Sequence, residues 1–158
     1  EKLSREQRKL SKCEKGSNNR AKQRKRVAKL HKKVSNQRKD FLHKQSRQIT
    51  NAYDAVVVEN LNMKDMSKAL RFGKAVHDNG WGMFIMFLQY KLTEAGKQLV
   101  KIDKWFPSSK TCSVCGKKKD DLALSEQSYS CECGNIMYRD QNAAINIRQE
   151  GLRLLGLT

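Results

Sequence analysis

The sequence predicts an α/β fold with one small insert, and three observations lead to this fold class. Stretches with the apolar spacing of helices alternate with two short runs typical of strands, in the order helix, strand, helix, strand, insert, helix. Four of the five cysteines fall within residues 112–133, directly before the last helical stretch. The 158 residues are enough for one sizeable core, or for a modest core with a small appendage.

Residues 17–52 are predicted to form one long helix. Their apolar residues recur at steps of three, four, seven or eight, and neither proline nor glycine interrupts them. The apolar stripe is narrow, and most of the remaining circumference is Lys, Arg, Gln and Asn. Such a helix can lay one face on a core and present the other to phosphates. The stripe consists of Val27, Leu30, Val34, Phe41, Ile49 and Ala52.

Two strands and a second helix are predicted next. The β-branched run AVVVENL predicts a strand over 55–60 that is buried on both faces. Residues 62–80 have no clean period and are predicted as a loop or short helix. A helix is predicted over 80–96, followed by a strand over 98–105 that Pro107 ends. The apolar side of this helix is Trp81, Phe84, Ile85, Leu88, Leu92 and Ala95.

A last helix is predicted over 139–154, directly after the cysteine-containing insert. Its small and aliphatic residues suggest one packing side. That side consists of Ala143, Ala144, Ile147 and Leu154.

Positive charge is concentrated in the first part of the chain. Residues 1–47 contain 18 Lys and Arg against 4 Asp and Glu, while the whole chain carries a net charge of +17. This asymmetry predicts a polyanionic partner, with nucleic acid ahead of a membrane surface. The alternative is a charged helix that is merely well solvated. The candidate nucleic-acid-binding residues of the long helix are Arg20, Lys22, Arg24, Lys25, Arg26, Lys29, Lys32 and Lys33.

No apolar run approaches the length that a membrane-spanning helix needs, which is about 20 residues. The longest run is GMFIMFL, over 82–88, and the N-terminus lacks the apolar segment of a signal peptide. We therefore expect an intracellular protein without a membrane partner. In a reducing compartment, clustered cysteines are expected to bind a metal before they form disulfides.

The cysteine spacing is C-x2-C-x15-C-x-C, formed by Cys112, Cys115, Cys131 and Cys133. Two close pairs separated in this way can bring four thiolates to one tetrahedral Zn²⁺. Such a site has no open coordination position, so zinc would stabilise the structure rather than catalyse a reaction. Disulfides are the alternative. Cys13 stands apart and is most simply a free thiol.

Several lysines surround this cluster in the sequence. They either balance the negative charge of the thiolates or contact nucleic acid. They are Lys110, Lys117, Lys118 and Lys119.

Two carboxylates are candidates for a catalytic metal site. Glu59 ends the first predicted strand and Asp140 begins the last predicted helix. Sites in open α/β sheets gather at the carboxyl ends of strands, and converging carboxylates suit Mg²⁺ in two-metal phosphodiester hydrolysis. Alternatively, Glu59 simply meets solvent and Asp140 caps its helix. Asp103 ranks lower as a third candidate, and Glu132 is predicted to point to solvent.

Four segments, VVVENLNM (56–63), NGWGMF (79–84), KWFPSSKTCSVCG (104–116) and CECGNIMYRDQNAAINI (131–147), together resemble the TnpB/OrfB family. These are transposon-encoded proteins related to type V CRISPR effectors. The resemblance implies a partial RNase H-like (RuvC) nuclease fold with an inserted four-cysteine zinc ribbon. The implied domains are a nuclease portion over 1–106, the zinc ribbon over 107–138 and a nuclease helix over 139–158.

The family's members are RNA-guided DNA endonucleases of prokaryotic cells with an Asp–Glu–Asp triad. The resemblance therefore implies a cytoplasmic protein with structural Zn²⁺, catalytic Mg²⁺ or Mn²⁺, and DNA and guide RNA as partners. Carried over by motif, Glu59 matches the middle acid and Asp140 the last. Arg139 matches the arginine beside that last acid and is a further candidate for nucleic-acid binding. The four clustered cysteines match the zinc ligands.

One departure concerns the family's first aspartate, which lies in a G-x-D-x-G strand upstream of the basic helix. This chain begins EKLSREQRKL and contains no such strand. Because Mg²⁺ demands near-ideal geometry, we expect the chain alone to be inactive, or to work with a missing N-terminal portion. The alternative is a non-cleaving zinc-ribbon protein or regulator that binds nucleic acid and derives from such a nuclease.

Overall fold

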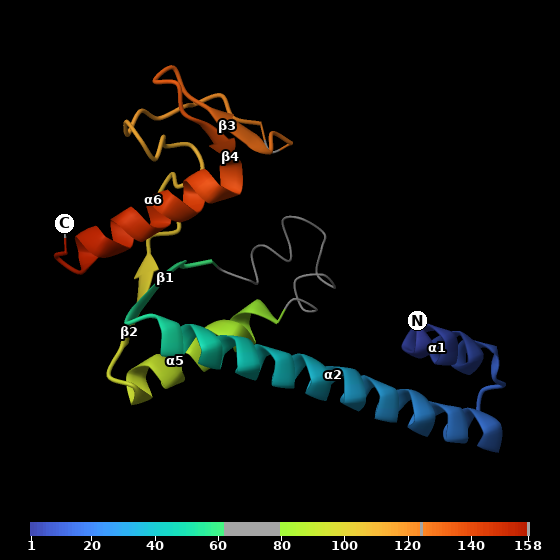
Figure 1. The fold of residues 1–158 in the computed structure, drawn as a ribbon. Coiled ribbons are helices and arrows are strands. Elements are labelled where there is room, and N and C mark those ends of the chain that lie inside the picture. Colours follow the sequence, from blue (N-terminus) through green and yellow to red (C-terminus); the bar gives the residue numbers. More distant parts are fainter. Residues whose placement is uncertain (62–79, 124, 158) are drawn as a thin grey trace.

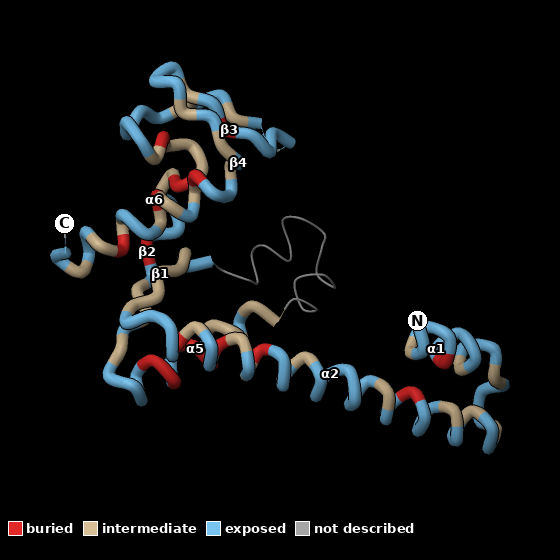
Figure 2. The backbone as a smooth tube through the Cα atoms, in the orientation of Figure 1, coloured by how far each residue is buried: buried red, intermediate tan, exposed pale blue. Residues whose placement is uncertain are grey.

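The computed structural model describes residues 1–61, 80–123 and 125–157 (Figure 1). The loop or short helix predicted over 62–80 lies, apart from residue 80, outside the described residues. In Figure 1 the long helix runs away from the rest of the fold, and the N-terminal helix folds back on its distant end. The strands and the other helices gather at its C-terminal end, where most buried positions lie (Figure 2). The described elements are α1 (Lys2–Lys12), α2 (Asn18–Ala52), β1 (Ala55–Glu59), α5 (Trp81–Glu94), β2 (Gln98–Ile102), β3 (Ser128–Ser130), β4 (Ile136–Tyr138) and α6 (Arg139–Leu154).

Helix α2 covers nearly the whole stretch predicted as one helix, and Ser17 caps it by accepting a hydrogen bond from the Arg20 backbone N–H at 3.2 Å. Helix α1, which the apolar spacing does not predict, packs against α2 as a hairpin. The hairpin is held by polar contacts: the Gln23 amide donates to the Glu6 side chain at 2.8 Å. Glu6 is only 5% exposed and also lies near Lys9 and Arg26. Polar residues that make such contacts do not produce the regular apolar spacing from which a helix is predicted.

At its other end α2 packs on α5 through small polar residues. Ser46 and Thr50 are buried, and each hydroxyl donates to the carbonyl four residues earlier, at 2.7 and 2.9 Å. Their small size lets the two helices approach closely, and their internal hydrogen bonds avoid unpaired polar groups. The predicted apolar stripe is therefore wrong here, because Phe41 is 59% exposed while Ser46 and Thr50 occupy the packing face. The buried residues of α5 are Phe87, Leu88, Lys91 and Leu92.

The strands β1 and β2 form a parallel pair in which Glu59 lies opposite Ile102. All five residues of β1 are half-buried, so the expectation that this strand is buried on both faces is wrong. Among the described residues β1 has one strand neighbour, which accounts for its partial exposure. The second strand is shorter than predicted, because the Asp103 carboxylate accepts a hydrogen bond from the Trp105 backbone N–H at 2.6 Å and turns the chain. Asp103 is exposed and serves this turn.

The last helix lies over both strands, and it has the predicted bounds but a different packing side. Its buried residues are Asn142, Asn146 and Gly151, whereas Ala144 and Leu154, predicted to pack, are exposed. Gly151 meets β1 so closely that an added Cβ would lie 2.2 Å from Val57 Cγ2. Glycine therefore permits the close crossing of helix and strand that places the start of α6 near the end of β1.

The Gly151→Ala variant should lower the free energy of unfolding by about 1–3 kcal/mol, the usual cost of overpacking. Urea denaturation measures this change. Gly82→Ala, a glycine in α5 with open space around its Cβ position, is the matched control and should be neutral or slightly stabilising. Equal effects of the two substitutions would contradict the close crossing.

Within the described part of the chain, no helix combines the length and apolarity needed to cross a lipid bilayer.

Candidate metal centre and active site

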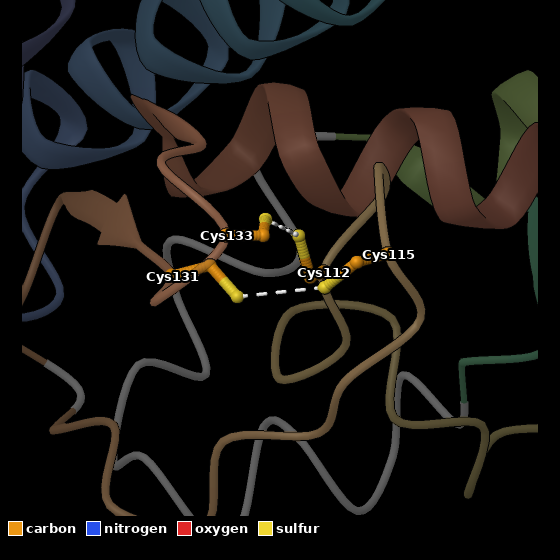
Figure 3. Close-up of side chains that lie close together, drawn as sticks. All are labelled: Cys112, Cys115, Cys131 and Cys133. Carbon is orange, nitrogen blue, oxygen red and sulfur yellow. Dashed lines mark hydrogen bonds between the residues drawn. The ribbon is translucent and has the colours of Figure 1, made fainter.

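The four cysteines converge in the module between β2 and α6 (Figure 3). Cys112 and Cys115 come from the loop after β2, and Cys131 and Cys133 from the turn between β3 and β4. All four sulfur atoms lie within 4.8 Å of one another. The Cys112–Cys133 sulfur distance is 3.7 Å and the Cys115–Cys131 distance is 3.6 Å. Sulfurs bound to a tetrahedral Zn²⁺ at about 2.3 Å are about 3.8 Å apart, so the cluster could hold a metal such as zinc.

Hydrogen-bond donors surround the most buried of these sulfurs, that of Cys112. Burial alone would raise the pKa of this thiol, but the backbone N–H groups of Cys115 and Val114 and the Asn135 amide donate to the sulfur and lower the pKa to about 6. The Asn135 nitrogen lies 3.5 Å from the sulfur. Donors of this kind favour the thiolate, which is the form that binds metal.

Two glycines and a tyrosine shape the turns of the module. Gly116 and Gly134, which follow the two cysteine pairs, have φ angles of 74° and 88°, a conformation that glycine adopts at little cost. Tyr129 on β3 is fully buried, and its hydroxyl donates to the Lys110 carbonyl at 3.3 Å. The tyrosine thereby ties the two halves of the module together.

Two of the four lysines of the module pair with its own acids. Lys117 lies 2.5 Å from the Glu132 carboxylate, and Lys118 lies 3.6 Å from that of Asp120. Glu132 is exposed, as predicted, and this ion pair is therefore well solvated. The carboxylates of Glu132 and Asp120 thus neutralise part of the positive charge near the cysteines.

The two predicted catalytic carboxylates line one cavity. Its volume is about 350 Å³, and it lies between the end of β1, the loop that leads to Cys112 and the first turns of α6. Glu59 is half-buried, and its Oε1 accepts a hydrogen bond of 2.6 Å from the Ser108 hydroxyl. The lining residues are Glu59, Ser108, Ser109, Lys110, Leu122, Arg139, Asp140, Ala143, Ala144 and Ile147.

Asp140 reaches this cavity from the first turn of α6. The residue at the cap position of the helix is Tyr138, without a capping side-chain hydrogen bond, so Asp140 is not the N-cap that the alternative interpretation required. A carboxylate in the first turn is still favoured by the helix dipole. Arg139 beside it donates its side chain to the Ala123 carbonyl at 3.1 Å and its backbone N–H to the Gln127 carbonyl at 2.8 Å. The arginine thus fixes the entry of the chain into α6.

Two buried asparagines of α6 bind the loop that carries Ser108 and Cys112. The Asn146 amide nitrogen donates to the carbonyls of Ser108 and Thr111, at 2.7 and 2.6 Å. The Asn142 amide donates to the Thr111 carbonyl at 2.7 Å and accepts from the Ser113 backbone N–H at 2.9 Å. We call this set of contacts the asparagine clamp. It fastens residues 108–113 to the helix that carries Asp140.

Sequence reasoning missed Ser108, Asn142 and Asn146. The signal that could have found them is the pair of asparagines four residues apart, which share one face of a helix. Asparagine is a poor helix former, and two of them on the packing face need partners such as free loop carbonyls. Apolar periodicity instead favoured the neighbouring residues Ala143, Ala144 and Ile147.

The basic residues predicted to bind nucleic acid lie mainly around the α1–α2 hairpin. A groove of about 490 Å³ between these helices is lined by four lysines, one arginine, one glutamate and one leucine. Arg20 differs from the other candidates, because its guanidinium donates to the Leu10 and Cys13 carbonyls and holds the hairpin turn. The groove residues are Lys2, Glu6, Lys22, Lys25, Arg26, Lys29 and Leu30. Arg24, Lys32 and Lys33 are exposed on the same helix.

Comparison with known proteins assigns both halves of the chain to related families. Residues 1–70 match the OrfB_IS605 family, described as "Probable transposase", and residues 81–147 match the family "Cas12f1-like, TNB domain". A protein of Streptomyces pristinaespiralis, named for RNA-guided DNA endonuclease activity, is 40% identical over 150 residues. InsQ of Escherichia coli (strain K12), named for the same activity, is 30% identical over 170 residues.

These relatives are much longer than the present chain. The match covers 95% of this chain and 37% of the Streptomyces protein, and 98% of this chain and 42% of InsQ. A solved structure, the Cas12f1–sgRNA–target DNA complex, superposes with a TM-score of 0.66 at 23% identity, covering 92% of this chain and 39% of that one.

The superposition confirms the predicted fold class, a partial RNase H-like α/β fold with an inserted four-cysteine module. The family matches on both sides of residues 71–80 agree with the motifs that first suggested the relationship. The chain therefore belongs to the TnpB/OrfB family.

Proposed function

We propose that this chain forms part of a metal-dependent, RNA-guided DNA endonuclease in which Glu59 and Asp140 hold Mg²⁺ or Mn²⁺. The single observation that carries the proposal is the cavity that both carboxylates line, although they come from a strand and a helix far apart in the sequence. Oxygen ligands of this kind suit both ions. The likeness to RNA-guided endonucleases supports the same assignment.

The chemistry that such an ion supplies is Lewis-acid stabilisation of the charge that develops on a phosphodiester during hydrolysis. In the described residues, the cavity lining contains two carboxylates, with Lys110 and Arg139 beside them. Two carboxylates hold a magnesium ion less firmly than three. We therefore propose that the chain by itself does not cleave DNA, and that a further ligand completes the site.

We propose that the groove of the α1–α2 hairpin binds the phosphate backbone of nucleic acid. Its lysines are exposed and come from two helices, so they can contact several phosphates along a nucleic-acid backbone rather than a single anion.

The four-cysteine module would have a structural role. Bound zinc would hold the loop of Cys112 in place, and with it the asparagine clamp.

Replacing Lys22, Lys25 and Lys29 together by alanine should weaken binding to double-stranded DNA and make it less salt-dependent. The slope of log affinity against log salt should fall by about 0.9 for each phosphate that the variant no longer neutralises. Fluorescence anisotropy over a salt series measures this slope. A matched triple substitution of Lys44, Lys101 and Arg148, which are exposed elsewhere on the fold, should leave the slope largely unchanged. Equal slopes for the two variants would contradict the assignment of the groove.

A cleavage assay separates the proposal from a second candidate, a non-cleaving nucleic-acid-binding protein. The second candidate is favoured by the two-carboxylate lining of the cavity. The complete gene product that contains this sequence, with its guide RNA and Mg²⁺ or Mn²⁺, should cleave target DNA. Binding without cleavage under these conditions would favour the second candidate.

A further inference from the structure

The Glu59 side chain is held by a hydroxyl group whose own position is fixed by α6. Ser108 is 7% exposed, and its hydroxyl donates to Glu59 Oε1 at 2.6 Å. This distance is at the short end for such bonds, as expected when the acceptor is ionised. Ser108 contacts Oε1, so Oε2 can still face a cation in the cavity. The hydrogen bond therefore restricts the rotation of the carboxylate without occupying both of its oxygens.

The position of Ser108 is in turn fixed by Asn146, which is 3% exposed. The Asn146 amide has two hydrogens, and it donates them to the Ser108 carbonyl at 2.7 Å and the Thr111 carbonyl at 2.6 Å. Two carbonyl partners also settle the orientation of the amide, because only its nitrogen can donate. The Ser108 hydroxyl thus binds Glu59, and its backbone carbonyl binds Asn146 on α6, the helix that also carries Asp140.

We propose that Ser108 is a positioning residue for the Glu59 carboxylate, and that Asn146 keeps Ser108 at a fixed position relative to Asp140. The inference rests on the proposed function, since it assigns a role within the same metal site. A carboxylate at the end of a strand can turn toward solvent, and Asp140 is on another element. A shared hydrogen-bonded loop keeps the two carboxylates facing one cavity, which is what a cation with strict geometry requires.

The affinity for Mn²⁺ tests this role without any cleavage reaction. Electron paramagnetic resonance of the complete gene product gives the dissociation constant. Ser108→Ala should raise it about 10- to 100-fold, the usual effect of removing a hydrogen-bond partner from a metal ligand. Ser108→Thr, which keeps the hydroxyl, should restore most of the affinity. Ser128→Ala is the matched control, because Ser128 is exposed on β3 and does not line the cavity.

Three outcomes would overturn the role of Ser108. These are an unchanged Mn²⁺ affinity in Ser108→Ala, a threonine variant as weak as the alanine variant, or an equal loss in Ser128→Ala. Glu59→Gln distinguishes this failure from failure of the proposed function. If Glu59→Gln abolishes Mn²⁺ binding while Ser108→Ala does not, only the positioning role is wrong. If Glu59→Gln binds Mn²⁺ normally, the metal site itself is wrong.

Discussion

Replacing Glu59 by glutamine should slow DNA cleavage by the complete gene product about 10³-fold, because a metal ligand contributes several kcal/mol and each 1.36 kcal/mol is a factor of ten. Glutamine keeps the size of the side chain and can still accept the hydrogen bond from Ser108. It lacks the negative charge that holds a divalent cation. Asp140→Asn should have an effect of the same size, since both residues line one cavity. Single-turnover cleavage of target DNA measures both variants.

The control for these substitutions is Glu94→Gln, which neutralises an exposed glutamate at the end of α5. It should cleave at the rate of the unaltered protein. The affinity for DNA should remain unchanged in Glu59→Gln and Asp140→Asn, because we propose that the basic hairpin makes the phosphate contacts. Full cleavage activity in Glu59→Gln would refute the role assigned to this residue.

If zinc occupies the four-cysteine cluster, its removal should unfold the cysteine module and detach its loop from α6. Zinc binding contributes on the order of 10–16 kcal/mol in zinc-finger peptides, and the small sheet of β3 and β4 offers little to replace it. Cys112→Ser should have the same effect, since it removes the most buried ligand. Elemental analysis should find about one zinc per chain in the unaltered protein and much less in the variant.

The loss of zinc should also affect the carboxylate site. Cys112 and Ser108 lie on one short loop, which the asparagine clamp joins to α6. Chelation should therefore expose Asn142 and Asn146, and amide hydrogen exchange should show faster exchange at Ser113, whose N–H bonds to Asn142. The matched control is Cys13→Ser, which lies outside the four-cysteine cluster. A zinc content far below one per chain, or unchanged exchange at Ser113 after chelation, would contradict this coupling.

Patterns that depend on local spacing predict this protein well. The long helix, the helix over Trp81–Glu94 and the last helix follow from apolar periodicity and the absence of proline. The cysteine cluster follows from the spacing of its two pairs, because soft ligands in that pattern have few other uses. Glu59 and Asp140 stand out in the sequence by their positions at the end of a strand and the start of a helix.

Polar packing explains what the sequence did not predict. Ser46 and Thr50 take the place of apolar residues between α2 and α5, and Asn142 and Asn146 do so between α6 and the loop. Their partners are backbone carbonyl groups, which every residue carries, so the sequence does not show which residues they bind. The N-terminal hairpin depends in the same way on Glu6 and Gln23. These contacts can be identified only from the three-dimensional structure.

The most direct test of the shared metal site is the anomalous scattering of Mn²⁺ in crystals of the complete gene product. We predict a peak between Glu59 and Asp140, about 2.0–2.2 Å from at least one carboxylate oxygen of each residue. The hydroxyl of Ser108 should remain bonded to the other oxygen of Glu59. A manganese site that omits either carboxylate would contradict the assignment of this cavity as the catalytic centre.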